Sequence, residues 1–158
     1  MRELILLRHA HAEPSAPGQA DIDRPLSAHG LGEARAAAAW LAEHRWHPDR
    51  VLCSPARRTR ETLSALQEAI PGLDCQLEES IYEASPGDLA TLADRHREVE
   101  RLLMVGHNPG FEQLAALLYS GQSGDYRGMP PAAVAVLSLP ADAVIEPGIA
   151  KLAAFWWP

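Results

Sequence analysis

Basic residues and cysteines are both scarce in this sequence of 158 amino acids. Its 14 lysines and arginines are outnumbered by 21 aspartates and glutamates, which gives a formal net charge of −7. Proteins that bind nucleic acid usually carry a basic patch or stripe. We therefore expect no nucleic-acid partner, although a small phosphate can still bind where a few arginines meet. The two cysteines, Cys53 and Cys75, lie in or beside apolar segments, where free thiols pack as small hydrophobes. We expect both thiols to be free in a reducing cytoplasm.

Long apolar runs are missing as well. A membrane-spanning helix needs about 18 or more apolar residues in a row, and no such run occurs, so we expect no membrane association. The apolar stretch before Arg8 is too short for the core of a signal peptide, and export is not expected. We find no internal repeat. A chain of this length buries roughly 70 % of its extended surface, so we expect a single domain over residues 1–158 that needs no disulfide or metal to fold.

Short apolar segments alternate along the chain with segments of helical spacing. Buried strands are predicted at residues 3–7, 50–53 and 102–105, with a weaker strand at 74–77. Helices are predicted at residues 31–44, 56–69, 86–97 and 111–119. Residues 133–139 and 149–157 flank a Pro-Gly turn and predict a terminal hairpin. This order predicts an α/β three-layer sandwich, with a mainly parallel sheet and an antiparallel C-terminal edge.

Three local features add to this outline. Residues 12–25 are rich in proline, glycine and aspartate, which predicts an irregular loop. Ser54 and Pro55 fit the N-cap and the first residue of the helix predicted at 56–69. The aromatic residues at 155–157 are expected to complete a layer of the core rather than to form a patch for a partner.

Each of the three clear strands ends in a polar loop. The loops carry Arg8-His9, then Ser54 with Arg57-Arg58, then Gly106-His107-Asn108. In open α/β sheets a ligand binds outside the carboxyl ends of the strands. Arginine matches phosphate oxygens with two parallel hydrogen bonds, and a neutral imidazole is a nucleophile or proton carrier near pH 7. One such residue alone is more often structural or solvated, but three loops at one edge indicate phosphoryl transfer through a histidine.

These segments resemble a known family. Leu7-Arg8-His9-Ala10, the run from Ser54 to Thr62 that opens a helix, and Val105-Gly106-His107-Asn108-Pro109 are similar, in this order, to motifs of the histidine phosphatase superfamily. The resemblance spans nearly the whole chain and implies the phosphoglycerate-mutase-like fold. The segment from Asp23 to Ser27 and the lack of a large inserted cap resemble the SixA-type phosphohistidine phosphatases in particular.

The resemblance implies a role for each residue of the pocket. His9 would be the nucleophile that becomes a phosphohistidine intermediate, and Arg8 would hold the phosphate. The second arginine of the family lies four residues after the serine of the Ser-Pro segment, which selects Arg58. His107 would bind the phosphoryl oxygens and stabilise the charge of the transition state. No metal and no cofactor is expected.

Two positions depart from the family pattern. Ala10 stands where glycine is usual after the nucleophile, so we expect a backbone without positive φ there. The carboxylate that serves as general acid in larger members has two candidates here, Glu79 and Glu83, and both can equally belong to a solvated segment. His11 is expected to point away from His9, either behind the pocket or at the surface.

The expected activity is a metal-independent phosphatase, with protein phosphohistidine as the preferred substrate. Imidazole is a better leaving group than an alkoxide because its conjugate acid has a pKa of ~6.5, which makes a general acid less necessary. Three alternatives remain open: a phosphatase of a small phosphorylated metabolite, a metal-dependent hydrolase that uses His9, His11 and an aspartate, and a non-catalytic phosphate-binding module. The choice of substrate depends on residues 12–25 and 121–131, whose conformation the sequence does not predict.

Overall fold

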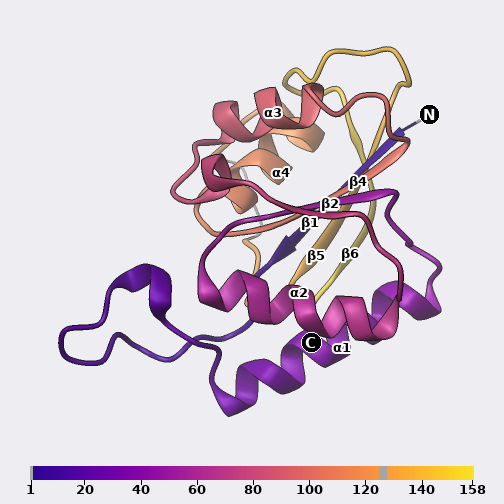
Figure 1. Ribbon diagram of the computed structural model, residues 1–158. Coiled ribbons are helices and arrows are strands. Elements are labelled where there is room, and N and C mark those ends of the chain that lie inside the picture. The colour runs from indigo at the N-terminus through magenta and orange to yellow at the C-terminus, as the bar shows by residue number, and fades with distance from the viewer. Residues whose placement is uncertain (1, 125–127) are drawn as a thin grey trace.

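The computed structural model describes residues 2–124 and 128–158, which form one twisted sheet with helices on both faces (Figure 1). In chain order the elements are β1 (Arg2–Arg8), η1 (Asp21–Asp23), α1 (Ala28–Glu43), β2 (Arg50–Cys53), α2 (Arg57–Ala69), β3 (Cys75–Leu77), η2 (Glu79–Ile81), α3 (Pro86–Asp94), β4 (Arg101–Gly106), α4 (Gly110–Ser120), β5 (Val134–Leu139) and β6 (Lys151–Trp156). The strand order is β3-β2-β4-β1-β5-β6. The first four strands are parallel, and β5 runs antiparallel to both β1 and β6. The predicted α/β architecture with an antiparallel C-terminal edge is confirmed.

The central strands are buried on both faces, which is why they appear as continuous apolar runs in the sequence. Leu4 and Leu6 of β1 point to the side covered by α3 and α4. Ile5 and Leu7 point to the opposite side, which α1 and α2 cover (Figure 1). Full burial of each such side chain contributes about 1.5–3 kcal/mol. The two apolar layers therefore hold the sheet rigid beneath the loops that follow its strands.

The start of α2 differs from the prediction. This helix begins at Arg57, and its N-cap is Ala56, whose side chain caps nothing. The backbone N–H of Ser54 donates instead to the Val105 carbonyl of β4, at 3.0 Å. Because the chain is still paired with the sheet at Ser54, the helix cannot begin there. The prediction of Ser54 as N-cap is wrong, and its side chain is available for another contact.

Residues 12–27 form an arm that extends away from the helices and the sheet (Figure 1). Its two branches are joined by a bridge between Ala12 and Leu26 and by a hydrogen bond from the Glu13 N–H to the Pro25 carbonyl, 2.9 Å long. The turn η1 lies within this arm. The irregular loop predicted for residues 12–25 is thus a hairpin-like projection that is tied at its base.

The C-terminal aromatic residues and the two cysteines differ in how far they are buried. Phe155 and Trp156 pack against opposite faces of the sheet, as expected, whereas Trp157 is 52 % exposed. Cys53 and Cys75 are free thiols, as predicted. Across residues 2–124 and 128–158, we find no helix with the length and apolar character needed to cross a membrane.

Candidate active site

The three loops singled out in the sequence lie side by side. Strands β2, β4 and β1 are neighbours in the sheet, and Arg8 pairs with Gly106 at the ends of β1 and β4. The backbone N–H of His9 donates to the Gly106 carbonyl at 3.0 Å. The carboxyl ends of these parallel strands therefore bring His9, Ser54 and His107 to one edge of the sheet.

The ring of His9 is oriented by its own backbone. Its Nδ1 lies 2.7 Å from the Ala10 carbonyl oxygen, which can only accept, so the ring proton is on Nδ1 and the lone pair is on Nε2. Burial, opposed by the hydrogen bond to Ala10 and assisted by the neighbouring His107, Arg8 and Arg58, lowers the pKa of His9 to about 3. At neutral pH the ring is uncharged and its Nε2 is free to act as a nucleophile.

The backbone after His9 is held by α2. The N–H of Ala10 donates to Thr62 Oγ1 at 3.1 Å, and both groups are buried. Ala10 does not adopt a positive φ, as expected from the replacement of glycine. The position of His9 is thereby fixed from the sheet through Gly106 and from the helix through Thr62.

His107 faces His9 across the site, with 5.3 Å between the ring centroids. Burial, and after it the charge of Arg58, lowers the pKa of His107 to about 4. Its Nε2 lies 2.7 Å from Ser54 Oγ, and Ser54 is fully buried. Sequence reasoning missed this serine because the Ser-Pro pair was interpreted as a helix cap.

The two predicted arginines approach the site from different elements. Arg8 at the end of β1 donates from Nη1 to the Met129 carbonyl at 2.8 Å, and burial lowers its pKa. Arg58 in the first turn of α2 is only 6 % exposed. Its neighbours Arg57 and Arg60 are exposed on the same helix. The structure thus turns Arg58 inward, as the four-residue spacing from Ser54 predicts.

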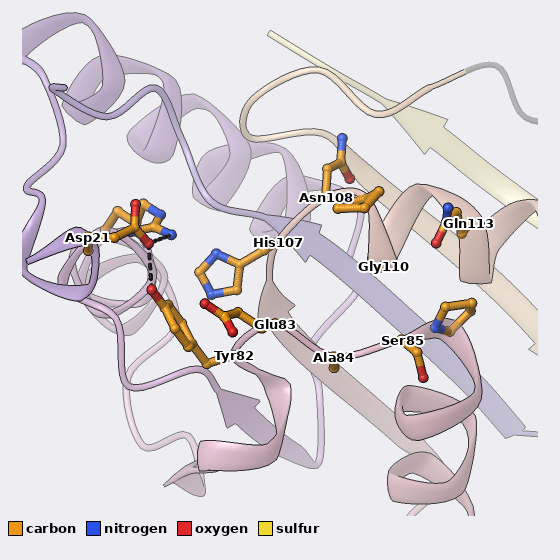
Figure 2. A pocket seen from close by; sticks show the side chains of 12 residues that line it. Asp21, Tyr82, Glu83, Ala84, Ser85, His107, Asn108, Gly110 and Gln113 are labelled. Carbon is orange, nitrogen blue, oxygen red and sulfur yellow. Dashed lines mark hydrogen bonds and ion pairs between the residues drawn. The ribbon is translucent and has the colours of Figure 1, made fainter. Parts of the chain in front are cut away.

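Asp21 holds Arg58 from the arm and was not anticipated. Arg58 donates from Nη1 to the Asp21 carbonyl at 2.8 Å and from Nη2 to its carboxylate at 3.0 Å. The same carboxylate accepts a hydrogen bond from the Tyr82 hydroxyl (Figure 2). It also accepts one from Arg24. These bonds, that of Tyr82 first, hold the pKa of Asp21 far below its usual range, so Asp21 is ionised at any pH at which the protein works.

A cavity of about 420 Å³ opens beside Arg58 and His107. The segment from Tyr82 to Pro86 forms one wall, and the start of α4 forms another (Figure 2). Arg8 and His9 are not part of this lining. The cavity therefore adjoins the group of arginines and histidines on the side of Arg58 and His107.

The two candidate acids occupy different positions. Glu83 lines the cavity, as His107 does (Figure 2). Glu79 is exposed in η2 and is not part of the lining. Of these two carboxylates, only Glu83 lines the cavity.

The residues suggested for a metal site do not come together. His11 directs Nδ1 to the Ser27 hydroxyl, 2.7 Å away, and its backbone N–H donates to Glu33. In the part of the chain that the structure describes, no three His, Cys, Asp or Glu side chains are grouped so that they could hold a metal ion. His11 thus lies at the base of the arm, where Ser27 and Glu33 are its hydrogen-bond partners.

Comparison with known proteins agrees with this geometry. The family model of the histidine phosphatase superfamily (branch 1) matches residues 4–136. The chain belongs to this superfamily. This histidine phosphatase is 37 % identical over 160 residues to an uncharacterized protein of Mycobacterium tuberculosis, covering 94 % of this chain and 98 % of that protein. It is 29 % identical over 127 residues to the phosphohistidine phosphatase SixA of Escherichia coli, covering 77 % of this chain and 76 % of SixA.

Solved structures show the same fold over nearly the whole histidine phosphatase. A proposed phosphohistidine phosphatase SixA from Agrobacterium tumefaciens superposes with a TM-score of 0.87 at 33 % identity, over 99 % of this chain and 98 % of that one. The protein histidine phosphatase SixA complexed with tungstate superposes with a TM-score of 0.81 at 23 % identity, over 98 % and 96 % of the two chains. Family membership and fold together support a hydrolase that acts on phosphoryl groups.

Proposed function

We propose that this protein removes the phosphoryl group from phosphohistidine on a protein substrate, through a covalent intermediate on His9. The observation that carries the proposal is the setting of the His9 ring: its Nδ1 lies 2.7 Å from the Ala10 carbonyl oxygen, and the His107 ring faces it at 5.3 Å. Burial lowers the pKa of His9, and Arg8 and Arg58 are near enough to lower it as well, so the neutral ring is favoured. A neutral imidazole with a free Nε2 next to two guanidinium groups is suited to attack a phosphoryl group.

The reaction proceeds in two displacements. The Nε2 lone pair of His9 forms a bond to phosphorus, the bond from phosphorus to the leaving group breaks, and the electron pair departs with the leaving group. Arg8 and Arg58 bind the phosphoryl oxygens, and with His107 they stabilise the charge that develops on them. Water then attacks the phosphorus of phospho-His9, which releases inorganic phosphate and restores the neutral ring.

Two features favour a phosphohistidine on a protein. An imidazole leaving group needs less protonation by a general acid than an alkoxide does. This fits a site whose nearby carboxylate, Glu83, is exposed to solvent and is not enclosed as a dedicated general acid would be. The family likeness to SixA points in the same direction. The cavity volume of about 420 Å³ also lies in the range of small-molecule sites, so a small phosphorylated metabolite is the second candidate.

The test compares substrates at equal concentration: a protein carrying phosphohistidine, free phosphohistidine and common sugar phosphates. We expect the highest kcat/KM on the phosphohistidine protein and an acid-labile phosphoenzyme that His9→Ala does not form. Full activity of His9→Ala would contradict the mechanism. A preference for sugar phosphates would identify the metabolite phosphatase instead.

Two further measurements separate the remaining alternatives. Activity that is lost in excess chelator and restored by a divalent ion would show a metal-dependent hydrolase. Absence of turnover on every phosphoryl substrate, with inorganic phosphate still bound through Arg58, would show a binding module without catalysis. We expect turnover that survives the chelator and is lost in Arg58→Ala.

A further inference from the structure

Glu83 has an uncommon backbone conformation that is fixed by its surroundings. Its φ is +59°, in the left-handed region that residues with a side chain rarely adopt. The next residue, Ala84, donates its N–H to the Ile81 carbonyl at 3.2 Å. The Ala84 carbonyl oxygen packs so closely on Gly110 that a Cβ at Gly110 would be 2.4 Å away. Strained positions of this kind cluster at functional sites, and here the turn directs a carboxylate into the cavity (Figure 2).

Glu83 also differs from the other carboxylate of the cavity in its bonding. Asp21 is fully engaged by Arg24, Arg58 and Tyr82. Within the described residues, the side chain of Glu83 has neither a hydrogen bond nor an ion pair, and it is exposed. Glu83 is therefore the cavity carboxylate that a ligand can use without first breaking a contact within the protein.

The chemistry of a phosphorylated imidazole calls for an acceptor at a particular place. Phosphorus is bonded to one ring nitrogen, and the other must carry a proton if the ring is to leave as neutral imidazole rather than as an anion. The attacking ring has the mirror arrangement: His9 uses Nε2, while its Nδ1 keeps its proton and donates it in a hydrogen bond to the Ala10 carbonyl. The leaving ring thus needs an acceptor for its own distal N–H, just as the Ala10 carbonyl is the acceptor for the Nδ1–H of His9.

The position of Glu83 matches this need. In a phosphoryl transfer the attacking and leaving atoms lie roughly in line on opposite sides of phosphorus. Arg58 and His107, which would bind the phosphoryl oxygens, border the cavity together with Glu83, whereas His9 does not. A leaving group opposite His9 would enter this cavity, and its far nitrogen would approach the wall that Glu83 forms.

We propose that the Glu83 carboxylate accepts a hydrogen bond from the distal ring N–H of a phosphohistidine substrate and so selects phosphorylated imidazoles over phosphate monoesters. This inference rests on the proposed function. The proton on the distal nitrogen is taken up from solvent before the transfer. During the transfer a bond forms between His9 Nε2 and phosphorus while the bond from phosphorus to the substrate nitrogen breaks, and its electron pair returns to that nitrogen. The substrate ring departs neutral, with its proton still on the distal nitrogen and hydrogen-bonded to Glu83.

The experiment compares Glu83→Gln with the matched control Glu79→Gln, which changes a carboxylate of the same segment outside the cavity. The substrates are a phosphohistidine peptide and p-nitrophenyl phosphate, whose leaving group needs no proton. We expect kcat/KM of Glu83→Gln on phosphohistidine to fall about five- to tenfold, a moderate effect because the carboxylate is exposed to solvent. Activity on p-nitrophenyl phosphate should stay unchanged, and Glu79→Gln should resemble the wild type on both substrates.

The pH profile of kcat distinguishes this role of Glu83 from a structural one, because a purely structural role would not shift the profile. Glu83 raises the pKa of the bound substrate ring, so its removal should shift the alkaline limb on phosphohistidine to lower pH, by about half a unit to one unit. Equal losses on both substrates, or an unshifted limb, would overturn the role of Glu83 while leaving the phosphatase proposal intact. A wild-type enzyme that hydrolyses p-nitrophenyl phosphate but not phosphohistidine would overturn both the role of Glu83 and the proposed phosphohistidine substrate. Inactivity of His9→Ala on p-nitrophenyl phosphate would then still identify His9 as the nucleophile.

Discussion

The burial that keeps His9 neutral also makes folding sensitive to acid. Its pKa is about 3 in the folded protein, compared with about 6.5 in an unfolded chain. Below pH 6.5 the unfolded state binds a proton that the folded state excludes until the pH approaches 3. The unfolded state thus gains stability as the pH falls through this window.

We predict that His9→Asn removes part of this acid sensitivity. Between pH 7 and pH 5 the free energy of unfolding should fall by about 2 kcal/mol less in the variant than in the wild type. Denaturant unfolding at both pH values measures the difference. His44→Asn is the control, because this histidine is exposed at the C-terminal end of α1 and should leave the loss unchanged. Equal losses for His9→Asn and the wild type would show that His9 is not held neutral by burial.

Asp21 tests how Arg58 is held. Asp21→Asn removes the charged acceptor of the Arg58 guanidinium but keeps the size of the side chain, so Arg58 should lose its fixed orientation. We expect KM to rise about three- to tenfold with a smaller change in kcat, and stability to fall by no more than about 1 kcal/mol because half of the Asp21 side chain is exposed. Steady-state kinetics measure the changes in KM and kcat separately.

Asp23→Asn is the matched control for Asp21, because Asp23 lies in the same turn η1 and is exposed. It should leave KM unchanged. Tighter rather than weaker substrate binding in Asp21→Asn would mean that Asp21 competes with phosphate for Arg58 and does not position it.

At the scale of elements, the junction between β2 and α2 shows where sequence patterns mislead. Ser-Pro before a helical segment is typical of a helix start, yet the pairing of Ser54 with β4 delays the helix to Arg57. A long-range hydrogen bond overrides the local preference, and no local pattern contains it. The consequence is functional, since the serine hydroxyl then contacts His107.

We predict that Ser54→Ala lowers kcat about three- to tenfold. The neutral ring of His107 loses the hydroxyl that fixes its orientation, whereas the helix loses no cap. Ser54 Oγ also accepts a long hydrogen bond from the Ala56 N–H, at 3.4 Å, so stability should fall by about 1–2 kcal/mol, given a net contribution of about 1 kcal/mol for each hydrogen bond. Kinetics and denaturant unfolding of the same sample separate the two effects. A loss of stability with unchanged kcat would assign Ser54 a structural role alone.

The contact between the start of α4 and the turn before α3 gives a second prediction at this scale. In Gly110→Ala the new Cβ would meet the Ala84 carbonyl, so the turn that carries Glu83 must move. We expect destabilisation of about 1–3 kcal/mol together with reduced activity. Gly32→Ala is the control, since a Cβ at Gly32 in α1 would have no other atom within 4 Å, and this variant should be stabilised by about 0.5–1 kcal/mol. Thermal unfolding measures both.

Over the whole molecule, the sequence predicted what depends on regular structure and missed what depends on irregular segments. The strands are recognisable in the sequence as continuous apolar runs because they are buried on both faces. The ends of these runs then indicate Arg8 and His107 as candidate site residues. Asp21 and Tyr82 could not be found, because their contact joins two loops 61 residues apart whose shapes have no periodic signature. Residues 125–127, part of the segment expected to influence substrate choice, lie outside the described residues.

The positions of the site arginines change what the net charge of −7 implies about ligands. A net negative charge disfavours long polyanions, but Arg8 and Arg58 provide local positive charge near the carboxyl ends of β1 and β2. The net charge therefore argues against an extended nucleic acid and not against a site for a compact phosphoryl group.

The pairing of β1 also determines when activity can arise during synthesis. His9, the proposed nucleophile, follows this strand directly, yet the two neighbours of β1 are β4, beginning at Arg101, and β5, beginning at Val134. Contacts so distant in sequence form late. A nascent chain released before residue 134 would leave one edge of β1 unpaired, so the ribosome makes His9 long before the strands that fix its position.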